Sequence, residues 1–189
     1  MKVILTLFCC LSLGWGKGLA KDEIVQLSEE RRVVIAVPEG FHYSARRDDK
    51  GLIRAQLIDG AEKLSLQVVF LADPAGQVAD ENGQKDFLAA ATRVYAEGSV
   101  EQSYDFKALE PKVGSGLYCA FTDITLAHSG KPVPAGEYLH ATTGVKAWRG
   151  GFLLFTLLSN ETTSPEFHSL FRLLKDSFEE KKVPTGPLL

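Results

Sequence analysis

One stretch near the end of the chain, residues 150–178, constrains the fold more than any other. Gly150-Gly151 marks a turn, and residues 152–158 are then apolar at both alternating sets of positions. Such a run is typical of a strand that is covered on both faces. After a polar break, apolar residues recur at helical spacing and form one stripe: Phe167, Leu170, Phe171, Leu174 and Phe178. The chain is therefore organised around a buried strand that leads into an amphipathic helix.

The first twenty residues have the order of a secretory signal peptide. Lys2 precedes an apolar run over 3–13 that is too short to span a bilayer, and Gly18-Leu19-Ala20 ends it with small residues. We predict cleavage after Ala20, a single domain over 21–183 and a tail over 184–189. Lipidation is disfavoured because the bulky Phe8 precedes the first cysteine of the Cys9-Cys10 pair. The mature protein is expected to be periplasmic or secreted.

Charge and cysteine content narrow the possible partners. The 189 residues carry a formal net charge of −3, and loss of Lys2 and Lys17 with the signal peptide lowers it to −5. An acidic chain argues against nucleic-acid binding and gives no attraction to an anionic membrane. Cys119 is the one cysteine beyond the signal peptide, so no intrachain disulfide is expected and stability must come from the core. We expect no transmembrane segment in the mature chain.

The remaining patterns predict an α+β domain with a mainly antiparallel sheet of about six to seven strands and helices on both faces. The short link at Asp59-Gly60 predicts a hairpin. A helix with Phe87, Ala91, Val94 and Tyr95 on its buried face is expected to start at Asp80 or Asn82 and to end at Gly98. Residues 21–30 are interpreted as a loose lead-in, and 46–51 as a charged loop. The expected strands are 33–37, 53–57, 64–70, 104–108, 117–121, 138–148 and 152–158.

A resemblance to a known family rests on three short motifs. Val37-Pro38-Glu39-Gly40-Phe41 ends the first strand, Gly150-Gly151-Phe152 opens the last one, and the closing helix ends in Lys175-Asp176-Ser177-Phe178. In these features the chain resembles the PsbP/Mog1-like superfamily, over most of its mature length. The resemblance implies an α/β/α sandwich and a role in binding. It implies no catalytic residue, and no site is transferred to this chain.

Cys119 and His140 are the strongest candidates for chemistry. They lie on neighbouring predicted strands, and a thiol activated by a histidine is a known nucleophile. However, Cys119 shares its register with Leu117 and Phe121 and should face the core, where a cysteine behaves as a small apolar residue. The histidines have no metal-ligand spacing, and the acidic clusters lack the order of a calcium loop. We therefore expect no catalytic residue, no metal and no cofactor.

Three functions are compatible with the sequence. The first is a non-enzymatic, exported binding or accessory protein that contacts a protein or envelope partner through exposed loops. The second is a carrier of a small molecule or lipid, held between a helix and the sheet near Tyr95, Tyr118 and Trp148. The third is a thiol hydrolase that uses Cys119 and His140. The candidate interaction surface is the basic cluster with its neighbours and one residue of the proline-rich loop: His42, Tyr43, Arg46, Arg47, Lys50 and Lys131.

Overall fold

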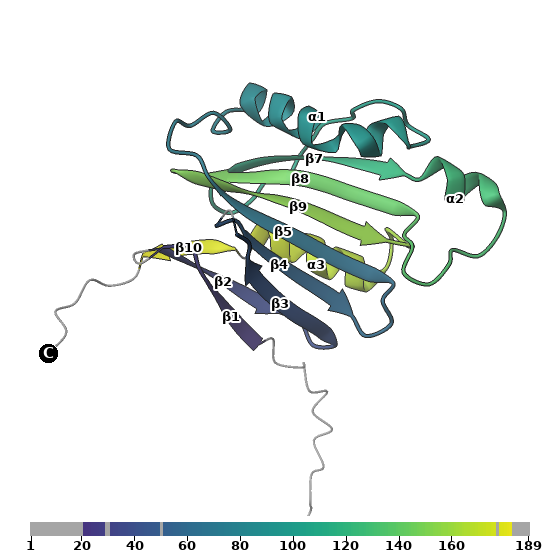
Figure 1. Ribbon diagram of the computed structural model, residues 1–189, viewed down its shortest axis with the longest axis horizontal. Coiled ribbons are helices and arrows are strands. Elements are labelled where there is room, and N and C mark those ends of the chain that lie inside the picture. The colour runs from purple at the N-terminus through teal and green to yellow at the C-terminus, as the bar shows by residue number, and fades with distance from the viewer. Residues whose placement is uncertain (1–20, 29–30, 50, 177, 183–189) are drawn as a thin grey trace, which may run out of the picture.

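The computed structural model describes residues 21–28, 31–49, 51–176 and 178–182, which form two antiparallel sheets and three helices (Figure 1). The large sheet has seven strands in the order β3-β4-β5-β9-β8-β7-β6, and the small sheet has three in the order β1-β2-β10. The elements are β1 (Lys21–Gln26), β2 (Arg31–Val37), β3 (Phe41–Arg47), β4 (Ile53–Asp59), β5 (Leu64–Ala72), α1 (Glu81–Glu97), β6 (Lys107–Ala108), β7 (Ser115–Thr122), α2 (Ile124–Ser129), β8 (His140–Trp148), β9 (Gly151–Ser159), α3 (Pro165–Asp176) and β10 (Glu179–Lys182).

Strand β9 is the middle strand of the large sheet, as its doubly apolar sequence predicts. Leu153, Phe155 and Leu157 pack on the face that α3 covers. Phe152 packs on the opposite face, which α1 covers over β7 and β8. We call these the α3 face and the α1 face. The α+β class, with an antiparallel sheet and helices on both faces, is confirmed (Figure 1).

The small sheet adds a layer that the sequence analysis did not anticipate. Its inward residues Val25, Val33 and Ile35 join the core on the α3 face, beside α3 itself. The predicted strand 33–37 is therefore real, but it belongs to this second sheet. Strand β1 occupies residues that were interpreted as a loose lead-in, and that interpretation was wrong. Its polar composition reflects an edge position, where one side of the strand faces water.

The closing helix α3 buries most of the stripe that was predicted for it. Phe167, Leu170 and Leu174 are buried, together with Leu173. Phe171 is half-buried instead, with its ring 5.0 Å from that of Tyr118 in an edge-on arrangement. Phe178 is buried beyond the helix, in a left-handed backbone conformation with φ of 59°. No helix within the described ranges is long and apolar enough to cross a membrane.

Helix α1 begins and ends near the predicted residues, but the face that it turns to the sheet is only partly the predicted one. Asp80 caps it, because its Oδ1 accepts a hydrogen bond of 2.8 Å from Gly83 N. The buried positions are Gln84, Leu88, Thr92 and Ala96. Of the predicted buried face, Phe87 does pack against the core, with its ring 4.8 Å from that of Phe152, but Ala91 is exposed and Val94 is 80% exposed, so the prediction was wrong for these two.

Candidate binding surface

No helix or strand within the described part of the chain covers the α1 face of strands β3, β4 and β5. Helix α1 lies over β7 and β8, at the other side of β9 (Figure 1). Side chains at alternate positions of β3 to β5 therefore point to solvent, with Arg46, Arg54 and Gln67 exposed. A hollow of about 410 Å³ crosses these three strands. We call this surface the basic face and define it by Ser44, Arg46, Arg54, Gln56, Gln67 and Val69.

Two arginines stand side by side on the basic face. Arg46 of β3 and Arg54 of β4 are direct cross-strand partners, so their Cβ atoms lie about 4.5–5.5 Å apart. Arg54 Nε is 3.5 Å from Asp48 Oδ2, whereas Arg46 has no ion-pair or hydrogen-bond partner among the residues described. Like charges placed directly opposite each other repel, which costs stability unless an anion joins them. Paired guanidinium groups are well suited to carboxylates and phosphates.

Polar side chains extend the basic face across the sheet. Ser44, Gln56 and Gln67 follow one another from β3 to β5 as register partners, and Thr156 of β9 continues the row. The amide of Gln56 donates to Ser65 Oγ at 3.3 Å, while Gln67 is exposed. Hydroxyl and amide groups can both donate and accept hydrogen bonds. This row can therefore bind a polar, extended ligand next to the arginine pair.

The residues predicted as an interaction surface are only partly brought together. The predicted loop over 46–51 was wrong at its start, because Arg46 and Arg47 belong to strand β3. His42 and Arg46 lie on the α1 face, whereas Tyr43 and Arg47 alternate to the α3 face. Lys131 lies in the connection between α2 and β8, and Lys50 lies outside the described residues. Arg54, Gln56 and Gln67 were missed because they look like the ordinary solvent side of a strand.

The two predicted residues on the α3 face help to hold the fold together. Arg47 donates from Nη1 to Gly51 O at 2.9 Å and from Nη2 to Gln26 O at 3.1 Å, which ties β1 to the large sheet. Tyr43 packs against the core, and burial, helped by the negative charge of Glu23, raises the pKa of its hydroxyl. These contacts are structural, so the binding candidates of β3 are His42, Ser44 and Arg46.

Cys119 and His140 do not form a nucleophile and base pair. Cys119 is paired in register with Thr143, three residues beyond His140, so the two side chains project from opposite faces of the sheet. The thiol is 0% exposed, and burial, followed by the charge of Asp105, raises its pKa to about 11 against a smaller opposing effect of Lys107. His140 Nδ1 instead lies 3.3 Å from Thr122 Oγ1. The arrangement proposed for a thiol hydrolase is therefore wrong.

The aromatic residues suggested for a carrier pocket do not converge either. Tyr95 stacks on Phe121 on the α1 face, whereas Tyr118 contacts Phe171 on the α3 face. A hollow of about 510 Å³ does adjoin Trp148, but it lies at the end of the sheet, between the β5–α1 loop, the start of β7 and the β8–β9 turn. Neither Tyr95 nor Tyr118 lines this hollow, so the three aromatic residues do not share a pocket there.

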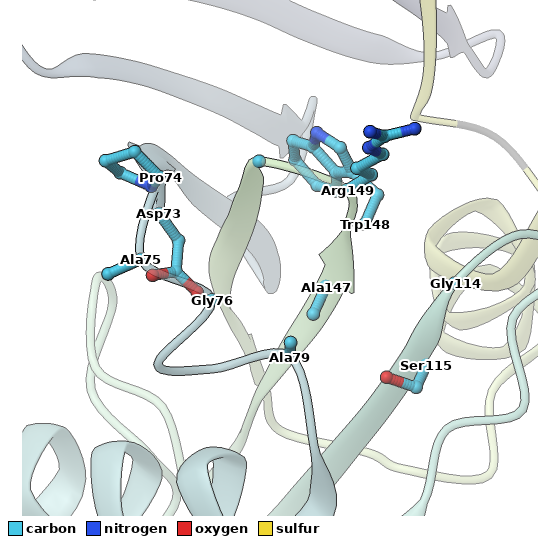
Figure 2. Close-up of a pocket in the computed structure, with 11 residues that line it drawn as sticks. Asp73, Pro74, Ala75, Gly76, Ala79, Gly114, Ser115, Ala147, Trp148 and Arg149 are labelled. Atoms are coloured by element: carbon cyan, nitrogen blue, oxygen red, sulfur yellow. The ribbon is translucent and has the colours of Figure 1, made fainter.

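Two of the polar residues that line this hollow, Asp73 and Ser115, are engaged in the fold (Figure 2), whereas Trp148 Nε1 is buried without a hydrogen-bond partner among the described residues. Figure 2 shows Asp73 on one loop, Trp148 and Arg149 across from it, and Ser115 on the neighbouring strand. The Asp73 carboxylate accepts from Gln77 N and Val78 N, both at 2.8 Å. Ser115 Oγ accepts from the buried Gln84 at 2.7 Å. This hollow is thus a junction of loops, and its apolar lining is limited to small residues and Trp148.

Comparisons with known proteins concern the fold. Neither the comparison with protein families nor that with curated sequences finds a match. Among solved structures, the solution structure of the cyanobacterial PsbP (CyanoP) from Synechocystis sp. PCC 6803 is similar, with a TM-score of 0.48 and 15% identity, over 83% of this chain and 91% of that one. Within the described residues, no cluster of three or more His, Cys, Asp or Glu side chains could hold a metal ion.

Proposed function

We propose that this protein is an exported, non-enzymatic binding or accessory protein, and that the basic face contacts an anionic partner in the cell envelope. One observation carries the proposal. Arg46 and Arg54 are adjacent on an open sheet face that borders a hollow, and Arg46 lacks a counter-ion among the described residues. An anionic group placed between the two guanidinium groups would relieve their repulsion and gain charge-assisted hydrogen bonds.

The overall charge of the chain indicates that attraction to anions is confined to the arginine pair of the basic face. The mature chain is acidic, with a net charge of −5, so a general attraction to anions is not expected. A pair of arginines on such a background gives specificity and a faster encounter with a partner of matching charge. Compared with the loop surface predicted from the sequence, the proposed contact lies on strands, which hold side chains in a more fixed geometry than loops do.

A binding experiment with charge-reversed variants tests this proposal. Mature protein is immobilised and exposed to envelope extract from its native host, and retained components are quantified by mass spectrometry. Wild type is compared with an Arg46→Glu, Arg54→Glu double variant. The matched control is Arg172→Glu, which reverses an exposed arginine of α3.

The expected result is a component that wild type and the control retain equally and that the double variant retains at least about tenfold less, since such charge contacts contribute about 1.5–3 kcal/mol. Binding should weaken as salt rises, because ions screen exposed charges. An identical set of components on all three proteins would refute the assignment of the basic face.

A further inference from the structure

Strand β3 forms a long open edge of the large sheet. In the described part of the chain it pairs with β4 alone, over its full length Phe41–Arg47. The opposite edge strand, β6, contains only Lys107 and Ala108. Ser44, Ala45, Arg46 and Arg47 are all exposed. An edge of this length presents a row of backbone N–H and C=O groups that a further strand can pair with.

The hydrogen-bond register shows which backbone groups face outward. Gly60 N donates to Gly40 O at 3.2 Å, and Asp48 N donates to Leu52 O at 2.9 Å. Both pairs continue the register of β3 with β4, in which hydrogen-bonded pairs recur at every second residue. Even-numbered residues of β3 therefore bond to β4. The N–H and C=O groups of Tyr43, Ala45 and Arg47 point to the outer edge.

We propose that β3 accepts an extended, acidic segment of the partner protein as an additional strand, an inference that rests on the proposed function. The positive charge of Arg46 and Arg54 favours an acidic segment as the additional strand. A strand paired to β3 places every second side chain on the α1 face, beside His42, Ser44 and Arg46. An acidic residue opposite Arg46 lies next to both arginines of the basic face. The intervening side chains fall beside Tyr43 and Ala45, where apolar residues fit. The segment that binds is therefore one in which acidic and apolar residues alternate.

Two synthetic peptides of seven residues provide the probe. In the first, glutamate alternates with valine, and in the second, lysine replaces glutamate. Binding to the mature protein is measured by calorimetry, and amide hydrogen exchange is followed by NMR. We expect only the glutamate peptide to bind, with slower exchange at the amides of Tyr43, Ala45 and Arg47 in the complex. This protection is a signature of strand pairing that a purely electrostatic contact does not produce.

A substitution on β3 distinguishes the contribution of backbone pairing to peptide binding from the contribution of charge. Ala45→Pro removes an outward N–H and leaves the β4 ladder intact, a position where an edge strand tolerates proline. It should weaken the glutamate peptide about tenfold or more, because it removes a backbone hydrogen bond and places a proline ring at the docking edge. Circular dichroism and thermal unfolding verify that the variant folds. The matched control is Ala108→Pro, which places a proline on the opposite edge strand, β6.

Each outcome decides the inference. Undiminished binding by Ala45→Pro, unprotected amides on β3, or no binding of the glutamate peptide would overturn strand addition. In each of these cases, loss of the envelope component in the Arg46→Glu, Arg54→Glu variant would still support the proposed function. Sedimentation of the mature protein tests another occupant. A dimer that Ala45→Pro converts to monomer would show that a second copy occupies the edge, and would overturn the acidic partner.

Discussion

The thiol of Cys119 is held in its neutral form by its position in the sheet. It is fully buried between Leu117 and Phe121, and its pKa is raised to about 11. Because the thiolate is the reactive species, we expect slow modification of the native protein by a thiol reagent at neutral pH and fast modification in denaturant. Rapid labelling of the folded protein, measured by absorbance or mass, would contradict this.

Lys146 is a charged residue in the core that completes the end of a helix. It is 2% exposed, and its Nζ donates to Leu174 O at 3.1 Å and Lys175 O at 3.4 Å, at the C-terminus of α3. The last carbonyls of a helix lack partners within the helix and carry partial negative charge. We therefore expect Lys146→Met to lower the free energy of unfolding by about 1.5–3 kcal/mol, measured by chemical denaturation. The exposed Lys63→Met should be neutral, and an equal effect of both would contradict this role.

His140 makes folding sensitive to mild acid. Burial lowers its pKa, and the opposing charge of Glu101 offsets this only in part. The unfolded chain therefore binds a proton at a higher pH than the folded protein, and stability falls as the pH drops below about 6.5. In His140→Gln, the loss of unfolding free energy between pH 7 and pH 5 should be smaller than in wild type. Equal losses in the two proteins would exclude this role.

Glu101 affects the stability of the fold in a separate, lower pH range. Burial raises its pKa, but hydrogen bonds from Thr122 N at 2.8 Å and from Thr122 Oγ1 at 2.9 Å outweigh burial, so the net pKa is lowered. A lowered carboxylate pKa stabilises the fold above the unfolded value of 4.5 and loses this effect as the pH falls through the folded value. The interval from pH 7 to pH 5 therefore reports on His140 with little contribution from Glu101.

At the scale of elements, helix α1 shows why apolar spacing alone predicted its buried face only in part. The polar Gln84 and Thr92 are buried because their side chains are satisfied, Gln84 by Ser115 Oγ at 2.7 Å and Thr92 by Leu88 O at 2.7 Å. We expect Leu88→Ala to cost about 2–5 kcal/mol of unfolding free energy. Val94→Ala should stay within about 0.5 kcal/mol, since surface changes are usually small. Comparable denaturation midpoints for both variants would refute this orientation.

The elements that could be predicted are those that lie in the core, because burial gives them a regular pattern of apolar residues. The apolar run of β9 and the stripe of α3 are of this kind, as is the β4–β5 hairpin. Edge strands β1 and β3 were missed because water-facing edges favour charged residues, and Arg46-Arg47 therefore looked like a loop. The basic face could not be predicted for a related reason. It depends on the register between β3 and β4, which places Arg46 against Arg54.

At the scale of the whole molecule, the proposal of export leads to a direct prediction. Small residues end the signal-like segment at Ala20. We expect protein isolated from its native host to begin at Lys21, because signal peptidase cleaves after such small residues. Intact-mass spectrometry checks this. Recovery of a chain that begins at Met1, or at an acylated Cys9 or Cys10, would exclude the predicted processing.

The central position of β9 also determines when the two halves of the large sheet can pair during folding. On one side β9 pairs with β5, which comes early in the chain, and on the other side with β8, so it alone joins the two halves of the large sheet. Until residues 151–159 are available, the β3–β4–β5 meander has no partner along β5. Pairings that are distant in sequence form slowly, because loop closure must precede them. In a chain exported as proposed, the two halves of the large sheet therefore cannot join until residues 151–159 have crossed the membrane.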